Sequence, residues 1–384
     1  MVQTDCRWFN GYKPCGKSAA CDASCKSKEV ALSRIVIVHL EALGAVLRAT
    51  SILPAIRRKY PKAHITWVTK APADLLLLEN KLIDRVYTLS LENILSLENL
   101  SFDVGFCIDK SLVATGLMRK LKVKELRGFT ASEAGAIVPA NSEADELWQL
   151  GLNDQLKFFK NQKAETQLMI EALALGDFKR DEYVLSLSEL EQKVADLRRS
   201  QWAPKNEIIV GLNTGCAAVI PYKKMSVAAH RELISKLTEI PEVKVVLLGG
   251  KEDVLRNQKI ARGLNVILSP MENGIRDGLS SMQACDVVVT GDSLGMHMAI
   301  ALKKWVVAWF GPTCEQEIDL YGRGEKISAQ VPCSPCWKRT CQKEVMCYDR
   351  VPLDQLLSAI HKGMKWKSSS SKQPFSETSS LVSL

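Results

Sequence analysis

Two buried apolar runs joined by a polar turn and a helix-forming segment restrict the fold of this chain more than any other feature. The first run, residues 287–290, leads into Gly291-Asp292-Ser293, and the second, residues 306–310, ends in Gly311-Pro312-Thr313. Strands that alternate with helices in this way indicate a parallel β-sheet covered on both faces. Ligands of such sheets bind at the carboxyl ends of the strands, where the next helix offers unpaired N–H groups.

The turn at Asp292 has the chemistry of an anion-binding site. A helix that begins here presents its positive dipole end, which suits a diphosphate. His297 follows Ser293 by four residues, so both side chains can face the turn. The alternative interpretation is that Asp292 or Ser293 only caps the helix. The position of the turn, directly after a buried strand, favours a nucleotide-using enzyme.

The composition excludes several classes of protein. The 384 residues are enough for two domains, and 46% hydrophobic with 24% charged residues is typical of a globular protein. No apolar run reaches the roughly 18 residues of a membrane helix, and no secretory signal is evident. The net charge of +8 suits phosphate-bearing ligands or an anionic membrane surface. Because no basic stripe is interleaved with aromatic residues, we expect no nucleic-acid partner.

The pattern of strands and helices predicts an α/β protein of two Rossmann-like parallel-sheet domains that face a central cleft. The first domain, 30–185, would have strands at 34–39, 65–69, 85–89 and 102–108. The second, 206–350, would have strands at 208–213, 243–248, 287–289 and 306–308. The remaining segments are a cysteine-rich arm (1–29), a linker (186–205), a last helix (351–365) and a disordered tail (366–384).

Two further groups of polar residues follow strands of the second domain. Asn213-Thr214-Gly215 comes after the strand at 208–213, and Lys223 lies shortly beyond it. A glycine turn and a lysine can hold phosphate through N–H groups and a point charge, although lysine pairs are more often solvated surface. Gly249-Gly250 allows close approach of a ligand, and Glu252 either contacts a ribose or merely starts a helix.

These motifs occur in the same order in one enzyme family. Asn213-Thr214-Gly215, Lys223, Gly249-Gly250-x-Glu252, Gly291-Asp292-Ser293-x-x-x-His297 and Phe310-Gly311-Pro312-Thr313 resemble the corresponding motifs of glycosyltransferase family 9. Gly44-x-Val46-Leu47-Arg48-x-Thr50 and Ile65-Thr66-Trp67 are also similar to that family, so the resemblance spans about residues 30–360.

The resemblance implies a GT-B fold, an ADP-heptose donor and inversion at the anomeric carbon without a metal in the chemistry. It implies that domain 30–185 takes the acceptor and that domain 206–350 binds the nucleotide-sugar. It also implies that Glu252 contacts the ribose and that the donor diphosphate and sugar contact Lys223, Asp292, Ser293, Leu294, Gly295 and His297.

The chain differs from the family at position 45, where Ala45 replaces the aspartate that is commonly assigned as the base. Because general-base catalysis contributes about 10²- to 10⁴-fold, another carboxylate must serve or the chain is catalytically silent. Asp109 is the first candidate, since it follows the strand at 102–108 and resembles the base position of the autotransporter-heptosyltransferase branch. Glu41 is the second. The alternative for Asp109 is an ordinary strand-end carboxylate paired with Lys110. We expect Lys223 to stabilise the departing diphosphate.

Eight of the twelve cysteines fall in two groups. Cys333, Cys336, Cys341 and Cys347 are separated by two, four and five residues, which predicts a structural zinc or iron site; free buried cysteines are the alternative. Iron-bearing cysteine fingers of the autotransporter branch leave iron open. Cys6, Cys15, Cys21 and Cys25 have looser gaps and form a second metal site, a thiol-rich arm, or ligands shared with the first group.

The sequence therefore predicts an inverting glycosyltransferase that moves heptose or a related sugar from ADP-heptose, or another nucleotide-sugar, to a bacterial surface glycan such as lipopolysaccharide core. Its expected location is the cytoplasm, with peripheral contact at the inner face of the membrane. A protein-serine acceptor and a silent nucleotide-sugar-binding protein are the alternatives. The sequence does not predict the oligomeric state.

Overall fold

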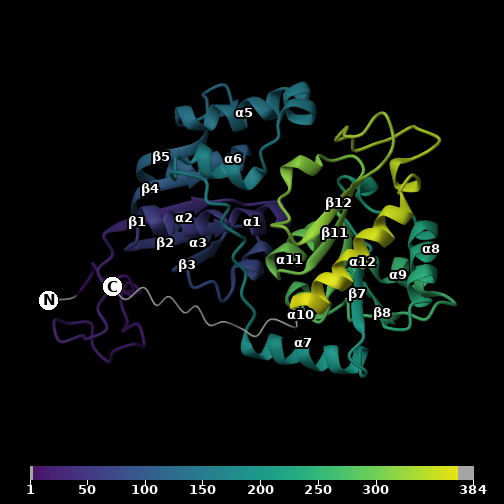
Figure 1. Cartoon of the computed structure of the whole chain (residues 1–384). Helices are drawn as coiled ribbons and strands as arrows, with labels where there is room; N and C mark the ends of the chain where they lie inside the picture. The colour runs from purple at the N-terminus through teal and green to yellow at the C-terminus, as the bar shows by residue number, and fades with distance from the viewer. Residues whose placement is uncertain (1–2, 371–384) are drawn as a thin grey trace. The chain divides into compact units, whose positions relative to one another are not determined.

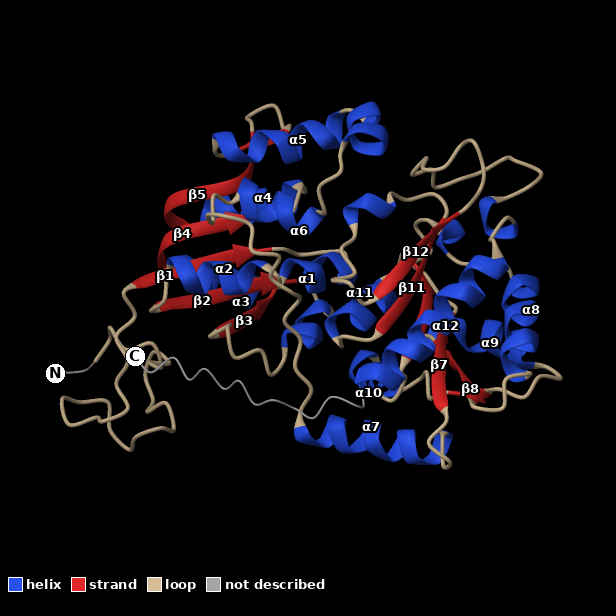
Figure 2. Ribbon diagram, viewed as in Figure 1, coloured by secondary structure: helices blue, strands red, loops and turns tan. Residues whose placement is uncertain are grey.

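The computed structural model describes residues 3–370 of the chain. It contains two compact units, Met1–Glu191 with Cys314–Asp319 and Gln192–Thr313 with Leu320–Leu384. Each unit is built around a six-stranded, mainly parallel sheet with helices (Figures 1 and 2). The predicted α/β class with two parallel sheets is confirmed.

The sheet of the first unit has the strand order β3-β2-β1-β4-β5-β6, and only the β5–β6 pair is antiparallel. Its strands are β1 Ser33–Val38, β2 Ala63–Thr69, β3 Arg85–Thr88, β4 Ser101–Cys107, β5 Lys122–Ala131 and β6 Ile137–Pro139. Side chains on one face, among them Trp67 and Phe106, share a core with Leu53 and Met169 of the helices. Both faces of the central strands are buried, which is why they are apolar almost throughout.

The helices of the first unit follow the strands in sequence. They are α1 Leu43–Ala49, α2 Ile52–Lys59, α3 Leu91–Glu98, α4 Leu112–Lys120, α5 Asp145–Leu152 and α6 Glu165–Ala172, with a short π-helical turn at Leu156–Lys160. Ser90 and Ser111 cap α3 and α4, because each hydroxyl accepts a hydrogen bond from a backbone N–H of the first turn.

The sheet of the second unit has the order β12-β11-β10-β7-β8-β9 and is parallel throughout. Its strands are β7 Ile208–Asn213, β8 Val243–Leu248, β9 Ile267–Leu268, β10 Val287–Gly291, β11 Trp305–Phe310 and β12 Gly324–Ser328. Its main helices are α7 Glu189–Trp202, α8 Val227–Thr238, α9 Val254–Ala261, α10 Ile275–Gln283, α11 Leu294–Ala301 and α12 Leu353–Ser370.

The last helix, α12, is part of the core of the second unit. It packs on β11, β12 and α8, and its Leu356 and Ile360 are fully buried. The indole Nε1 of Trp305 donates a hydrogen bond to the carbonyl of Ala359 at 3.0 Å. A methyl group on Gly363 would lie 2.4 Å from the Trp305 ring, so this turn of α12 lies directly on the indole.

In each sheet the strand order changes direction at one place, the topological switch point, and the two sheets have it at equivalent strands. In the first unit β1 lies between β2 and β4, and in the second β7 lies between β8 and β10. Successive connections diverge on the two sides of such a strand, which opens a crevice at the carboxyl ends. Candidate ligand-binding residues are therefore those that follow β1 and β4 in the first unit and β7 and β10 in the second.

Three details differ from the expectations or extend them. The last helix continues to Ser370, beyond the predicted end at 365, so residues 366–370 of the predicted disordered tail are helical. Residues 371–384 of that tail, like residues 1–2 of the arm, lie outside the described residues. Within residues 3–370, no helix combines the length and the apolar character needed to span a bilayer.

Candidate functional site

Asn213, at the end of β7, connects the two strands of the second switch point. Its amide Nδ2 lies 3.1 Å from both Thr290 Oγ1 and Ser293 Oγ, and 3.3 Å from the carbonyl of Gly215. A methyl group on Gly295 would lie 2.5 Å from the Asn213 amide carbon, so the first turn of α11 approaches Asn213 only because residue 295 is glycine. The predicted residues Asn213, Gly215, Ser293 and Gly295 are thus brought together.

Lys223 and Asp292 form an ion pair at the same crevice, with Nζ and Oδ2 2.9 Å apart. The pair depends on Gly291, because a methyl group there would lie 1.7 Å from the backbone carbonyl oxygen of Lys223. Burial alone would raise the pKa of Asp292, but the charges of Lys223 and His297 and the hydrogen bond from Lys223 hold it below its usual value. Asp292 therefore holds the Lys223 side chain in place at this edge of the sheet.

The N-terminus of α11 opens onto this ion pair. Ser293 is its N-cap residue, yet the hydroxyl makes no capping hydrogen bond and instead lies beside Asn213 and Thr290. The first N–H groups of a helix, here from Leu294 onward, have no partner within the helix. Together with Lys223 and the dipole end of α11, they make this edge of the sheet attractive to a diphosphate.

The glycine turn after β8 is built around a buried carboxylate. Asp253 accepts a hydrogen bond from the Gly250 N–H at 3.1 Å, and a methyl group on Gly215 would lie 2.0 Å from its Oδ2. Burial raises the pKa of Asp253, and the Gly250 hydrogen bond opposes that rise. Glu252 is exposed next to this turn. Thr214 is fully buried and hydrogen-bonds through its hydroxyl to Asn257, so its side chain has a structural role.

In the first unit, Asp109 and His39 stand at the switch point. Asp109 is buried, and its Oδ2 accepts hydrogen bonds from the N–H groups of Leu40 (2.8 Å) and Glu41 (3.4 Å). Among the described residues, the hydrogen bonds to this carboxylate all end on Oδ2, which leaves Oδ1 for a ligand. The predicted pairing of Asp109 with Lys110 is wrong: the Lys110 ammonium lies over the Phe129 ring and donates to the carbonyl of Leu147.

Sequence reasoning missed His39 as a site residue. Its Nδ1 lies 3.8 Å from Asp109 Oδ2, and its imidazole hydrogen-bonds to the backbone of Ala45. Burial lowers the pKa of His39, and the nearby Asp109 carboxylate opposes this shift. The available signal was its place at the end of the first strand, immediately before the loop that carries the Ala45 substitution.

Arg48 and Glu165 extend this polar cluster. Their side chains pair at 2.6 Å and are 12% and 26% exposed, so the pair is largely shielded from water. Burial would raise the pKa of Glu165, but the charge of Arg48 and of nearby lysines outweighs burial and lowers it. Glu41, the second candidate base, is 62% exposed and paired with Lys70. The geometry therefore favours Asp109 over Glu41 as the candidate general base.

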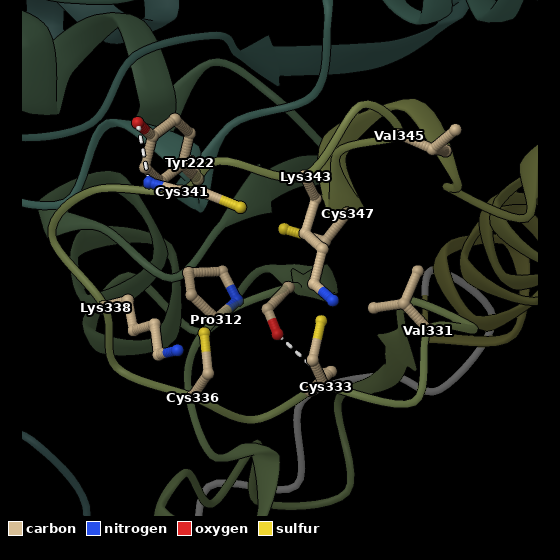
Figure 3. Close-up of a pocket in the computed structure, with 12 residues that line it drawn as sticks. Tyr222, Pro312, Val331, Cys333, Cys336, Lys338, Cys341, Lys343, Val345 and Cys347 are labelled. Carbon is tan, nitrogen blue, oxygen red and sulfur yellow. Dashed lines mark hydrogen bonds between the residues drawn. The ribbon is translucent and has the colours of Figure 1, made fainter.

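The cysteines of the C-terminal group line one small pocket in the second unit. Cys333, Cys336, Cys341 and Cys347 surround a cavity of about 30 Å³, and their sulfurs are turned toward its middle in Figure 3. Burial and the neighbouring thiols raise the pKa of Cys347 to about 11. A set of four thiols suits zinc or iron in kind.

A preformed metal site is nevertheless not confirmed for either cysteine group. Among residues 3–370, no three His, Cys, Asp or Glu side chains are placed so that they could hold a metal ion. In the N-terminal group, Cys6 is buried beside Val30, whereas Cys15, Cys21 and Cys25 are half-exposed. The metal predictions for Cys6, Cys15, Cys21, Cys25, Cys333, Cys336, Cys341 and Cys347 remain predictions.

Comparison with known proteins gives a consistent result. The model of glycosyltransferase family 9 (heptosyltransferase) matches residues 93–346. A lipopolysaccharide heptosyltransferase 1 of Campylobacter coli is 22% identical over 305 residues, which cover 73% of this chain and 84% of the relative.

Two solved structures share the fold. A family 9 glycosyltransferase of Veillonella parvula has a TM-score of 0.71 at 16% identity, over 89% of this chain and all of that one. The iron-containing dodecameric glycosyltransferase TibC of enterotoxigenic Escherichia coli has a TM-score of 0.55 at 10% identity, over 87% of this chain and 77% of that one. TibC has also been solved in complex with ADP-D-β-D-heptose. At these identities the structural likeness shows the fold alone, whereas the family model covers most of the chain. The chain therefore belongs to glycosyltransferase family 9, the heptosyltransferase family.

Proposed function

We propose that this glycosyltransferase moves heptose from ADP-heptose to a bacterial surface glycan such as lipopolysaccharide core, with inversion at the anomeric carbon. The observation that carries the proposal is the Lys223–Asp292 ion pair at the N-terminus of α11. Gly291 and Gly295 have no side chain there, which allows the backbone of Lys223 and the amide of Asn213 to approach closely. The complex of TibC with ADP-D-β-D-heptose supports the choice of donor. The remaining donor contacts would come from Asn213, Gly215, Gly250, Glu252, Ser293, Leu294 and His297, whereas Thr214 is buried beneath them.

The proposed reaction is a single displacement. The acceptor hydroxyl oxygen forms a bond to the anomeric carbon, the bond from that carbon to the diphosphate oxygen breaks, and its electron pair leaves with ADP. Asp109 accepts the hydroxyl proton on Oδ1, while the Leu40 and Glu41 N–H groups hold Oδ2. Lys223 and the α11 N-terminus stabilise the charge that develops on the leaving diphosphate.

Ala45 sets the main alternative, a nucleotide-sugar-binding protein without turnover. Its backbone contacts His39, and His39 neighbours Asp109, so position 45 belongs to the same cluster as the proposed base. A carboxylate at 45 would therefore lie near Asp109 rather than in a separate site. This proximity supports a relocated base over a lost one.

The test is to measure transfer and donor hydrolysis by the purified chain with ADP-heptose, beside Asp109→Ala and Ala45→Asp. We expect turnover by the wild type and loss of turnover in Asp109→Ala. Tight donor binding without turnover, restored by Ala45→Asp, would establish the silent binder instead. A lipid-core acceptor and a serine peptide run in parallel separate a glycan acceptor from a protein one.

The acceptor proposal includes contact with an anionic membrane face. Leu152, Leu156 and Phe159, at the end of α5 and in the following π-helical turn, are 64%, 37% and 56% exposed, and Lys160 lies beside them. Exposed apolar side chains next to cationic ones are typical of surfaces that bind a bilayer interface. Co-sedimentation with phosphatidylglycerol vesicles checks this, and Phe159→Ser should reduce the bound fraction.

We also propose that Cys333, Cys336, Cys341 and Cys347 hold one structural zinc or iron. Their common pocket supports this, as does the iron of TibC. Four thiolate ligands leave no open coordination position, so no step of the transfer would pass through the metal. Metal analysis of protein purified under reducing conditions should give about one metal per chain. Loss of that metal in Cys336→Ser, but not in Cys216→Ser, would assign it to this group.

A further inference from the structure

The cysteine loop, residues 331–350, is fastened to the strand end that carries Gly311 and Pro312. The N–H groups of Cys336 and Trp337 both donate to the carbonyl of Pro312, at 3.0 and 2.8 Å. The hydroxyl of Ser334 donates to the carbonyl of Gly311. Two N–H groups on one carbonyl fix the backbone of the loop at this point, including the direction in which Trp337 leaves it.

Trp337 has an unusual backbone conformation. Its φ is +52°, in the left-handed region that is uncommon for a bulky residue. Such a conformation is unfavourable for a tryptophan and persists only where the surrounding structure enforces it. Its indole ring lies against the proposed donor lysine, with Lys223 Nζ 5.2 Å from the ring centroid.

The loop also holds the residue before the lysine. The Cys341 N–H donates to the hydroxyl oxygen of Tyr222 at 3.3 Å. The Tyr222 ring stacks on Tyr348, with centroids 6.1 Å apart and planes inclined by 11°. The short helical turn at Pro221–Lys223 is thus held by the loop from two sides, through Tyr222 and through Trp337.

An aromatic ring is well suited to hold this ammonium group. A lysine has three N–H donors, and Asp292 accepts from one of them at 2.9 Å. A ring face attracts the cation without a second carboxylate, which would compete with an anionic ligand. The remaining N–H groups of Lys223 are then available to diphosphate oxygens.

We infer that Trp337 is a positioning residue for the donor: it holds the Lys223 ammonium against the diphosphate, and the cysteine loop exists in part to place it. This inference rests on the proposed donor function. It assigns to the loop a direct effect on donor affinity.

The test is titration of ADP and of inorganic diphosphate into the full-length wild type, Trp337→Leu, Trp337→Phe and Val345→Ser by calorimetry. Since a cation–π contact that is partly shielded from water corresponds to roughly tenfold in affinity, Trp337→Leu should weaken both ligands about tenfold. Trp337→Phe retains a ring and should stay within about threefold of wild type. Val345 is an exposed residue of the same loop, so Val345→Ser should bind like wild type.

A double-mutant cycle tests whether Trp337 affects donor affinity through Lys223. In a Lys223→Met background, Trp337→Leu should weaken binding no further, because the ring then has no cation to hold. In turnover, Trp337→Leu should raise the donor KM and leave the acceptor KM unchanged, which a general loss of folding would not do.

The outcomes separate the two proposals. Unchanged affinity for both ligands in Trp337→Leu, or an equal loss in Val345→Ser, would overturn the role of Trp337. Diphosphate binding that depends on Trp337, without ADP binding, would overturn ADP as the donor nucleotide and keep the positioning role. Binding of neither ligand by the wild type would overturn both.

Discussion

The two units use the same sheet topology to build different kinds of site. At the second switch point, β7 and β10, the edge of the sheet is shaped by backbone: Gly215, Gly291 and Gly295 each occupy a position where a methyl group would collide with a neighbour. At the first switch point, β1 and β4, the edge of the sheet carries buried ionisable side chains, among them Asp109 and His39. Added atoms should therefore disrupt the second site, whereas removed charges should disrupt the first.

The largest effect is expected from changing one atom in the first unit. Asp109→Asn keeps the shape of the side chain but removes the base, so kcat should fall by about 10²- to 10⁴-fold. The affinity for ADP should stay unchanged, because the proposed donor contacts all lie in the second unit. Steady-state kinetics and calorimetry measure the two quantities.

Glu41→Gln is the matched control for Asp109→Asn. The Glu41 carboxylate is exposed and its partner Lys70 is also solvent-accessible, so its removal should change kcat by less than about threefold. A larger loss in Glu41→Gln than in Asp109→Asn would reverse the assignment of the base.

The next effect is a loss of stability at acidic pH, which we expect in both units because each contains a buried histidine. Burial lowers the pKa of His64, on β2, and of His230, on α8, to about 4 each. Between about pH 6.5 and pH 4 the unfolded chain binds these protons and the folded chain does not, so stability is fully present above pH 6.5 and falls on acidification. Each histidine should contribute a loss of up to about 3 kcal/mol.

Urea unfolding at pH 7 and pH 4.5 measures this loss. His64→Gln and His230→Gln should each flatten the pH dependence, because glutamine has no proton to gain. Equal slopes in wild type and both variants would show that these imidazoles do not govern acid sensitivity.

The smallest effect is expected from adding one methyl group to the second unit. Gly291→Ala would place a carbon 1.7 Å from the Lys223 carbonyl, so the backbone must shift. We expect a loss of about 1–3 kcal/mol in the free energy of unfolding, together with weaker ADP binding. Gly278→Ala, in the middle of α10 with no close contact, is the control and should stabilise slightly. Equal stability of the two variants would contradict a backbone-shaped site.

The sequence allowed the apolar strands to be predicted well and the highly charged strands poorly. β7 was predicted to the residue, because a parallel strand covered on both faces is a continuous apolar run. β5 and β12 were missed, since Lys122–Ala131 and Gly324–Ser328 carry charged residues that give no such signal.

The site divided in the same way. The positions of Asp292 and Ser293, at a strand-to-helix turn, could be predicted from the local sequence. The contacts of His39, Arg48 and Trp337 could not, because their partners lie 70, 117 and 114 positions away in the chain. No local periodicity encodes contacts between strands β1 and β4 or between a loop and an earlier turn.

The packing of α12 has a consequence for the order in which the protein can be completed during synthesis. Trp305 and the strands beside it are made before the helix that covers them, and its segment around Gly363 lies directly on the indole. Until that segment is available, the growing chain displays an aromatic surface of the kind that favours aggregation. The second unit therefore becomes self-sufficient only late in translation, and its solubility in the cell should depend on chaperones during that interval.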